Sequence, residues 1–452
     1  MTIDILPEDV FLEIFDHYVD PTRISAGIEA WCTLTQVCRK WRNIVLESPH
    51  RLNLRIRCHP AKPVREKLDI WPDLPIFLAQ CDEEWKDDWG VDNVLVALEQ
   101  NNRICHICLY ILPSQQLEEI LAAMHKPFPA LTHLDLMSEE PTLTVDPDLF
   151  LGGSAPCLRY LQLYRITFPR LPQLLSSATH LTDLHLVNIP FDGYISPETM
   201  VSCLSALTRL KSLKLEFEDP ESIPVWEHQR PPPHTRSPLP ALTWLEFSGI
   251  GEYLEDLVDR ISAPVLDALI LSFFPQSIPD TGQLAQFINR TPKLKTPNKA
   301  RVLFRDSSVF LVFRGMSYGV VAREFSSVAE VWTSSFSQAF SPTVERLYVS
   351  DKKAYWQGDM GVENNHWLEI LRPFTSVKSL YLSREIVQRI APALQEIVRE
   401  RVVGFLPSLK TLFLEDLNIS GPVQEAIDLF VSARQFSSHP VAVSHWKGKS
   451  ID

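Results

Sequence analysis

The 452-residue sequence lacks long apolar runs and any excess of basic residues. Its most apolar stretch, residues 265–274, is shorter than the roughly 18–20 residues of a membrane-spanning helix and contains Asp267 and Ser272. The formal net charge of −13 argues against a phosphate-binding surface, because nucleic-acid affinity depends on Lys and Arg. We therefore expect neither a membrane nor a nucleic acid as a partner.

Cysteine is sparse, and the N-terminal residues lack a secretory pattern. The eight cysteines are scattered between positions 32 and 203, with none in the C-terminal half. This distribution suits a reducing compartment better than a disulfide framework. The first residues lack the basic start, the apolar run and the small-residue cleavage site of a signal peptide. The sequence thus predicts an intracellular protein, located in the cytoplasm, the nucleus or both.

Patterns for catalysis and metal binding are also missing. Cys105 and Cys108 have C-x-x-C spacing, but no second pair follows, and residues three apart on a strand face opposite sides. Gly249 and Gly251 lack the third glycine of a dinucleotide-binding loop, and no G-x-S-x-G or phosphate-loop sequence occurs. We expect a non-catalytic chain without a metal or cofactor.

The N-terminal residues predict a short helix with an unusually wide apolar face. Pro7 suits the first helical position, and the acidic residues that follow it favour the positive end of the helix dipole. Val10, Ile14 and Tyr18 are four residues apart, and Phe11 with Phe15 repeats that spacing one position round the helix.

Two further short helices are predicted before residue 50. Apolar residues from Ala30 to Trp41 recur every three or four positions, and Ile44 and Val45 continue the pattern until Ser48-Pro49. Chains below about 40–60 residues bury too little surface to be stable alone. The remaining apolar surface of these helices therefore needs a partner.

The run Leu6-Pro7-Glu8-x-Val10-x-x-x-Ile14-Phe15, followed by Val37-Cys38-Arg39-x-Trp41-Arg42, resembles the F-box. The resemblance covers residues 4–50 and implies docking onto the small Skp-type adaptor of a cullin-based SCF ubiquitin ligase. The positions that it assigns to this contact or its immediate support are Leu6, Pro7, Val10, Ile14, Phe15, Val37, Cys38 and Trp41. The alternative interpretation is a small helical cap on the next domain, with these residues as its core.

A register L-x-x-L-x-L recurs along most of the remaining chain. Its copies begin at Ile104, Leu131, Leu158, Leu181, Leu210, Leu242, Leu266, Val344, Val377 and Leu409. The second and third apolar positions of each copy are two residues apart, so they share one face of a strand. Helix-like stretches such as 113–125, 171–178 and 197–207 separate the copies. The pattern predicts an α/β solenoid with parallel strands on its concave face and helices outside.

These copies resemble leucine-rich repeats over residues 101–420, with one departure. The usual asparagine three positions after the last leucine is missing, and Asn188 and Asn418 stand one step away. We therefore expect a less regular curve. The order of F-box and degenerate repeats resembles the expanded F-box families of mushroom-forming fungi.

The predicted organisation has four parts. They are an F-box at 1–50, a connecting segment at 51–100, a repeat solenoid at 101–435 and a tail at 436–452. The register lapses at 272–343, where 299–304 and 308–313 predict a hairpin and 325–340 a helix. We interpret this stretch as a decorated part of the solenoid; a separate small domain is the alternative.

Residues that alternate with the inward leucines predict a binding surface on the concave face. Its candidate target-binding residues are Tyr160, Tyr164, His185, Trp244, Arg346, Tyr348, Tyr381 and Phe413. Aromatic and arginine anchors are typical of protein-binding faces. With the F-box resemblance, this surface predicts a substrate-recognition subunit of an SCF-type ligase that binds a Skp-type adaptor, through it a cullin, and a target protein. The alternative is an F-box and leucine-rich-repeat interaction scaffold with no ligase role.

Overall fold

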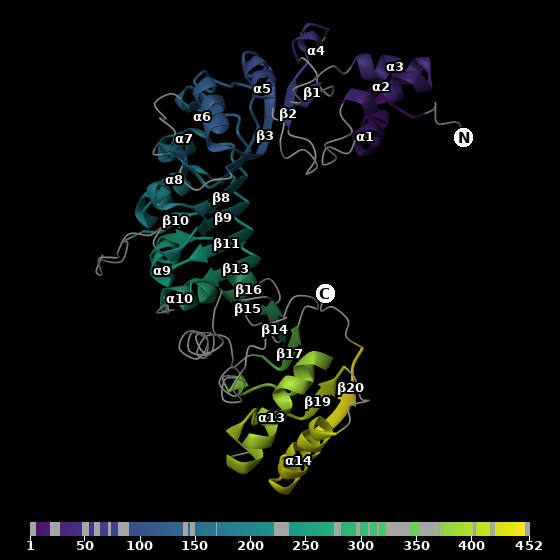
Figure 1. The fold of residues 1–452 in the computed structure, drawn as a ribbon, viewed down its shortest axis with the longest axis vertical. Helices are drawn as coiled ribbons and strands as arrows, with labels where there is room; N and C mark the ends of the chain where they lie inside the picture. Colours follow the sequence, from purple (N-terminus) through teal and green to yellow (C-terminus); the bar gives the residue numbers. More distant parts are fainter. Residues whose placement is uncertain are drawn as a thin grey trace. The chain divides into compact units, whose positions relative to one another are not determined.

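The computed structural model shows two compact α/β units, one formed by residues 1–195 and 202–210 and the other by residues 196–201 and 211–452 (Figure 1). The residues that the structure describes are 6–18, 28–47, 54–57, 64–70, 74–79, 90–138, 143–144, 150–168, 170–220, 235–274, 282–294, 299–305, 308–313, 316–321, 344–351, 367, 371–372, 374–400, 404–415 and 421–447. The first unit is called unit 1 below and the second unit 2.

Unit 1 begins with the three short helices that the sequence predicts, α1 (Glu8–Tyr18), α2 (Ile28–Val37) and α3 (Arg39–Leu46). Pro7 lies one residue before α1, and its carbonyl oxygen accepts a hydrogen bond from the Phe11 N–H at 3.2 Å. The expected position of Pro7 as the first helical residue is thus wrong by one step. Cys38 caps α3, because its Sγ accepts a hydrogen bond from the Trp41 backbone N–H at 3.4 Å.

In the part of unit 1 that the structure describes, six parallel strands follow one another in one sheet order. In spatial order they are β1 (Leu54–Arg57), β2 (Ile76–Ala79), β3 (Ile104–Leu112), β4 (His133–Ser138), β6 (Tyr160–Tyr164) and β8 (Asp183–Ile189). The predicted copies pair in register, with Leu134 beside Leu161 and Leu161 beside Leu184. All three of these leucines are fully buried. The leucine ladder that the repeat predicts is therefore confirmed in this unit.

Parallel pairing starts earlier than the sequence predicts. The expected connecting segment contains β1, α4 (Val64–Ile70), β2 and α5 (Val91–Leu98). Leu78 on β2 pairs with Ile107, which is the second apolar residue of its copy. Counted from Leu78, the first and third apolar positions of a copy fall on Pro75 and Gln80, which are not leucine-like residues. The register of leucines therefore could not reveal this strand.

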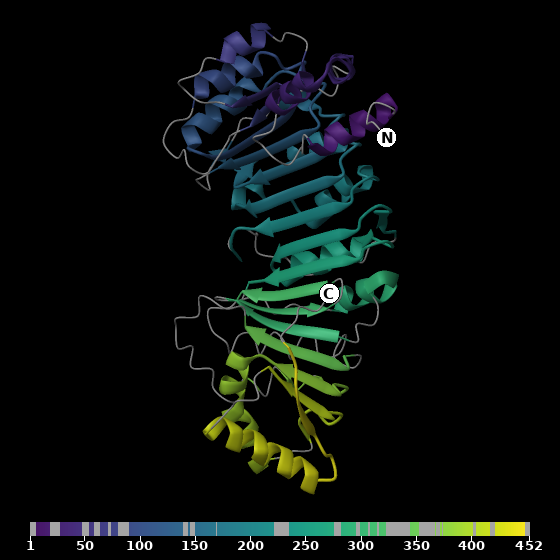
Figure 2. The same ribbon diagram turned by 90° about the vertical axis from the view of Figure 1, so that its right-hand side faces the viewer.

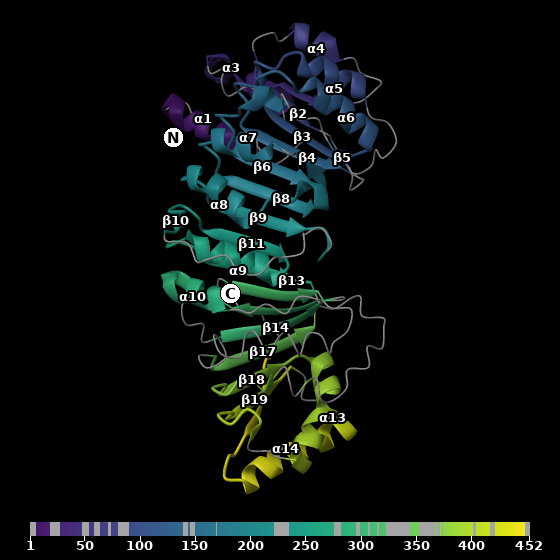
Figure 3. The same ribbon diagram turned by 90° about the vertical axis from the view of Figure 1, so that its left-hand side faces the viewer.

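Helices cover one face of the unit 1 strands. Figures 1 and 3 show α5, α6 (Ser114–Ala123) and α7 (Leu171–Ser177) on the same side, and Figure 2 shows the strands from the opposite side. The two outer helices expected at 113–125 and 171–178 are thus confirmed. Shorter elements complete the unit: β5 (Leu143–Thr144) pairs with β7 (Ile166–Thr167), and η4 (Phe150–Gly153) and η5 (Phe191–Gly193) are single turns. Helix α8 (Pro197–Ala206) contributes residues to both units.

Two successive repeats of unit 1 carry a left-handed residue, directly after β6 in one and near the end of β8 in the other. Arg165 and Asn188 stand at the same repeat position, and their φ angles are 54° and 51°. The Asn188 Nδ2 donates a 2.6 Å hydrogen bond to the Tyr164 hydroxyl oxygen on the neighbouring strand. The displaced asparagine thus joins two adjacent repeats through a side-chain contact.

Among the described residues of unit 2, ten strands follow one another in a single sheet order. In spatial order they are β9 (Ser212–Phe217), β11 (Trp244–Gly249), β13 (Ala268–Phe273), β16 (Met316–Val321), β15 (Ser308–Phe313), β14 (Lys299–Arg305), β17 (Arg346–Asp351), β18 (Ser379–Leu382), β19 (Thr411–Leu414) and β20 (Ala442–His445). β15 pairs antiparallel with both of its neighbours, β14 and β16. The two-stranded sheet β10 (Ser237–Pro238) and β12 (Ile261–Ser262) lies apart from this order.

The irregular stretch supplies strands to the same sheet. The predicted hairpin is confirmed as β14 and β15, but β16 is an additional strand. Because β16 pairs with β13 and β14 pairs with β17, the stretch is part of the sheet rather than a separate domain. The helix expected at 325–340 lies outside the described residues. β20 is also unexpected, since it falls within the predicted tail.

The helices of unit 2 are α9 (Gly251–Arg260), α10 (Gly282–Arg290), α13 (Arg384–Glu400) and α14 (Pro422–Phe436), with the single turn η7 (Pro292–Leu294). Figure 1 shows α9 and α10 on one side of β11 and β13. Gly249 is the last residue of β11, and the site needs glycine because a Cβ there would lie 2.8 Å from the Phe217 ring and 2.9 Å from the Phe247 ring. These two rings and Tyr253 form a buried aromatic cluster between strand and helix.

Candidate functional site

The interior of the N-terminal helices is aromatic. Phe11 and Phe15 are fully buried, and their ring centroids lie 6.0 and 4.8 Å from the ring centroid of Trp41. The Lys40 Nζ lies 4.7 Å from the centre of the Phe11 ring and donates a hydrogen bond to the Leu6 carbonyl oxygen at 3.3 Å. Phe15 and the half-buried Trp41 therefore hold α1 to α3, and little of either side chain is left for a partner.

The eight F-box positions divide into surface and support. Pro7, Ile14 and Val37 are exposed, with exposed fractions of 39% for Ile14 and 57% for Val37. The half-buried positions are Leu6, Val10, Cys38 and Trp41. Tyr18 and Leu46 are exposed by 58% and 56% and extend the apolar surface beyond the predicted set. The four-residue spacing of Val10, Ile14 and Tyr18 contained the signal for Tyr18.

The strand face opposite the helices of unit 1 has a ladder of stacked rings, which we name the unit 1 open face and define by Phe77, His106, His133, Tyr160 and His185. Successive ring centroids along the first four residues are 5.3, 5.1 and 5.9 Å apart. His185 meets Tyr160 edge-on at 5.4 Å. The predicted Tyr160 and His185 are therefore brought together, whereas His106 and His133 were missed. Both occupy the third position of their repeat copies, as Tyr160 does in its own.

A buried carboxyl group lies on the same face. The side chain of Asp135 is 7% exposed, and its Oδ2 accepts a 2.9 Å hydrogen bond from the Tyr110 hydroxyl. Burial raises the pKa of Asp135 to about 6, although hydrogen bonds from Tyr110 and Gln162 oppose the rise. Burial also lowers the pKa of His133, with Arg159 adding to the effect. Burial thus biases both groups towards their neutral forms.

Polar contacts fix the other predicted residues of unit 1. The Tyr160 hydroxyl donates to the Gln162 Oε1 at 2.8 Å. Tyr164 receives the hydrogen bond from Asn188 described above, and the Arg165 guanidinium lies 5.5 Å from the centre of the Tyr164 ring. The ring of Tyr164 is thereby held in one orientation.

Trp244 lies beside a charged cluster in unit 2. Its strand, β11, pairs with β9, where Lys214 forms ion pairs with Glu216 at 3.1 Å and with Glu246 of β11 at 3.0 Å. Burial alone would lower the pKa of Lys214, but the two carboxylates outweigh it and raise that pKa. In the strand order, β13, β16, β15 and β14 separate Trp244 from the strand that carries Arg346 and Tyr348. Trp244 is therefore not brought together with the other predicted residues of this unit.

A second ring stack crosses β17, β18 and β19; we name it the unit 2 ring stack and define it by Tyr348, Tyr381 and Phe413. These residues pair in register, and the successive ring centroids are 4.1 and 4.3 Å apart with interplanar angles of 11° and 5°. Burial raises the pKa of Tyr348. Arg346 lies two residues earlier on β17 and is exposed. Three of the predicted residues thus form one continuous aromatic surface.

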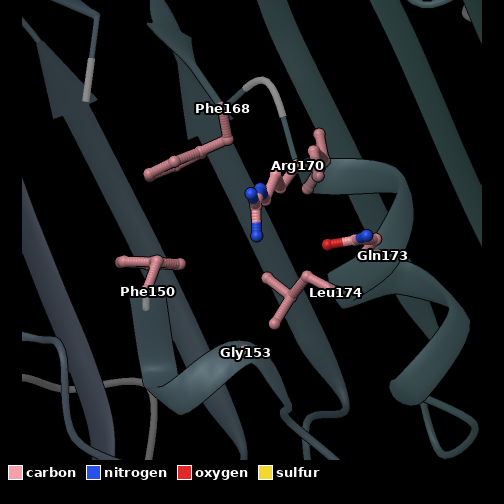
Figure 4. A pocket seen from close by; sticks show the side chains of 7 residues that line it. Phe150, Gly153, Phe168, Arg170, Gln173 and Leu174 are labelled. Atoms are coloured by element: carbon pink, nitrogen blue, oxygen red, sulfur yellow. The ribbon is translucent and has the colours of Figure 1, made fainter. Parts of the chain in front are cut away.

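A small surface depression lies beside η4 and α7 (Figure 4). The rings of Phe150 and Phe168 stack at 4.5 Å and form its apolar wall, and Arg170 and Gln173 are its polar lining residues. Because these lining residues include no carboxylate, thiol or imidazole, the depression offers no general base or nucleophile of those types.

Comparisons with known proteins agree with the N-terminal helices. Residues 3–52 match the F-box-like family model, so the chain carries an F-box-like domain there. Among solved structures, the leucine-rich repeat-containing protein LegL7 from Legionella pneumophila matches 84% of this chain and 97% of its own, at 14% identity and a TM-score of 0.28. No curated protein matches the chain. Within the described parts, no helix combines the length and the apolarity that crossing a membrane requires.

The chain thus joins an F-box-like domain to parallel strands that carry a repeated register of buried leucines.

Proposed function

We propose that this chain is the substrate-recognition subunit of an SCF-type cullin ubiquitin ligase. Its F-box-like domain docks onto a Skp-type adaptor, and through it a cullin, while the repeats bind a target protein. The observation that carries this proposal is the exposed apolar surface of α1, α2 and α3 above an aromatic interior. Such a role assigns the chain to the cytoplasm or nucleus, and agrees with its resemblance to the F-box families of mushroom-forming fungi.

The exposed positions of the F-box-like domain have the character of a docking surface. Ile14, Tyr18, Val37 and Leu46 are large apolar residues with exposed fractions of 39–58%. Burying an apolar side chain of this size stabilises a complex by roughly 1.5–3 kcal/mol. We assign the direct adaptor contact to Pro7, Ile14 and Val37, extended by Tyr18 and Leu46. Leu6, Val10, Phe15, Cys38 and Trp41 support that surface.

Target recognition is assigned to the strand faces opposite the helices. The assigned residues are Tyr160, Tyr164, His185, Trp244, Arg346, Tyr348, Tyr381 and Phe413. The rings of Tyr160, Tyr164, His185, Tyr348, Tyr381 and Phe413 are held by stacking or hydrogen bonds, so little conformational entropy is lost when a partner binds. The chain then contributes to ubiquitin transfer by positioning the target, and the ligase's other subunits supply the chemistry.

Capture of a purified Skp-type adaptor by the full chain tests the docking step. We expect Val37→Glu to abolish capture, because it places a charge in the apolar contact. Gln36→Glu adds the same charge at the neighbouring exposed residue of α2 and is expected to retain capture. If the wild-type chain fails to capture the adaptor, or if both variants bind equally well, the proposal is wrong.

The exposed surface is equally compatible with a scaffold that binds the adaptor without delivering substrates. Target turnover separates the two functions. A receptor gives a bound partner that gains ubiquitin and is degraded faster when the chain is present. A partner that binds the repeats but neither gains ubiquitin nor changes its lifetime indicates the scaffold.

A further inference from the structure

The unit 2 ring stack already has an occupant, which is the C-terminal segment of the chain itself. β20 pairs in parallel with β19, and Trp446 follows it directly. The Trp446 ring lies edge-on to Tyr348 and Tyr381, with centroid distances of 5.9 and 5.6 Å and interplanar angles of 66° and 76°. Its Nε1–H donates a 3.0 Å hydrogen bond to the Leu382 carbonyl oxygen at the end of β18. The indole therefore reaches across β19 onto two further strands.

β20 is attached differently from the strands beside it. In β18 and β19 every second side chain is buried, including Leu412 and Leu414. In β20, Ala442, Val443 and His445 are exposed and Ser444 is half-buried, so the strand inserts no side chain into the core. It is held by main-chain hydrogen bonds, such as Ala442 N–H to the Lys410 carbonyl oxygen at 2.9 Å. A strand with so few buried contacts opens at a lower free energy than its neighbours.

Two anchors flank this weakly attached strand. Val441 is 5% exposed and precedes it, and Trp446 follows it with both of its N–H groups bonded. The backbone N–H donates to the Leu414 carbonyl oxygen at 3.1 Å, and the indole N–H donates to Leu382 as above. The arrangement is that of a peptide added to a sheet edge, in which main-chain bonds supply affinity and a side-chain contact supplies specificity.

We propose that β19 and the unit 2 ring stack form a binding site for an extended, tryptophan-bearing peptide segment, which residues 441–447 of this chain occupy in the present structure. The inference deepens the proposed function, since a target segment with the same chemistry would enter by displacing the chain's own. The indole must follow the paired strand directly, because Trp446 reaches Leu382 only from the residue after β20. Tethering gives the internal segment a high effective concentration, so a target needs a better fit or a second contact to displace it.

A cleavable full chain tests this. A protease recognition sequence inserted between the exposed residues His439 and Pro440 lets the folded chain be cut so that all residues remain present. A fluorescent peptide with the sequence of residues 440–452 is then added to cut and uncut chains. We expect it to replace the cut segment and bind the cut chain, and to bind the uncut chain weakly or not at all.

Two variant peptides test whether binding depends on the tryptophan. Trp446→Ala is expected to weaken binding about tenfold or more, because it removes the hydrogen bond and both edge-on ring contacts. Val443→Thr changes an exposed side chain and is the matched control, with an affinity expected to equal that of the native sequence.

The proposal is overturned if the native peptide does not bind the cut chain, or if Trp446→Ala peptide binds as well as the native one. It is also overturned if release of the cut segment unfolds α13 and α14, measured by circular dichroism, because the segment is then part of the core. No adaptor enters this experiment, so its failure leaves F-box docking untouched, and failure of adaptor capture leaves this site untouched.

Discussion

The Trp41 indole packs against the Phe15 ring, with centroids 4.8 Å apart and planes inclined by 57°. This contact joins the two sequence blocks of the F-box-like domain, since Phe15 belongs to α1 and Trp41 to α3. Because Phe15 is fully buried and Trp41 half-buried, the pair acts mainly inside the domain. Variants at these positions and at the exposed positions should therefore lose adaptor binding for different reasons.

We expect Trp41→Ala to unfold α1–α3. Truncating a packed aromatic residue costs about 3–5 kcal/mol, and a unit of this size has little stability to lose. Hydrogen exchange should show loss of amide protection across residues 8–18 and 39–46. Ile14→Ser should keep that protection and still lose adaptor capture, and Trp41→Phe should retain both. Full protection in Trp41→Ala together with lost capture would instead make Trp41 a direct contact residue.

Leu184→Ala tests the leucine ladder of unit 1. Leu184 is fully buried on β8 and lies in register beside Leu161. We expect the substitution to lower the free energy of unfolding by about 2–5 kcal/mol, because it leaves a cavity among packed leucines. Urea unfolding followed by circular dichroism measures the loss, with the exposed Thr179→Ala as the control. A loss near zero would contradict the buried register.

The leucine copies could be predicted because the spacing of their leucines indicates which residues share a buried strand face. β1, β2 and β20 could not, because their residues depart from that spacing. β2 has buried Ile76 and Leu78, but Pro75 and Gln80, on either side of the strand, stand where the register would place its other apolar residues. β20 has no buried side chain and is last in the strand order, so it pairs with β19 without an apolar ladder of its own.

The candidate surfaces were predictable in part for a related reason. In-register stacking makes equal repeat positions neighbours, so Tyr348, Tyr381 and Phe413 could be grouped from sequence. Helical spacing defines the faces of α1 but does not say which face packs inward, so Phe15 and Ile14 could not be told apart. Trp446 was out of reach, since its contact with Leu382 spans 64 residues and depends on the unexpected β20.

Asp135→Asn should stabilise the chain in a pH-dependent way. A rise in pKa from the ordinary 3.8 to about 6 means that, between these values, the folded state binds more protons than the unfolded state. Stability from this group is therefore highest at low pH and falls as pH rises to about 6, by about 3 kcal/mol in total. Asparagine avoids that loss and can still accept the hydrogen bond from Tyr110.

Urea unfolding at pH 4.5 and pH 7.5 measures the difference between variant and wild type. We expect the variant to gain about 1 kcal/mol at the lower pH and about 3 kcal/mol at the higher pH. Asp192→Asn, at an exposed residue of the same unit, is the control and should show no such gain. An equal effect of Asp135→Asn at both pH values would mean that the buried charge is not its cause.

Arg434 fastens α14 to the loop that precedes β19. It is fully buried, and its guanidinium donates hydrogen bonds of 3.3 Å to the carbonyl oxygens of Phe405, Leu406 and Leu409. Burial lowers the pKa of Arg434. Leu406 has a left-handed backbone with a φ of 44°, so this loop conformation needs support from outside.

We expect Arg434→Met to lower the free energy of unfolding by about 3–5 kcal/mol, because it removes the donor to the buried Phe405 and Leu409 carbonyl oxygens. The Leu406 carbonyl oxygen still accepts a hydrogen bond from the Leu409 N–H. The free energy of unfolding of Arg434→Lys should lie between those of Arg434→Met and the wild type, since one ammonium group cannot reproduce the planar fork of donors. Hydrogen exchange should show the loss of protection first in β19 and α14, and the exposed Gln435→Ala should change neither region. Because β19 carries Phe413 and pairs with β20, Arg434→Met should also speed hydrogen exchange in β20. Unchanged exchange in β20 would show that the loop and the unit 2 ring stack are independent.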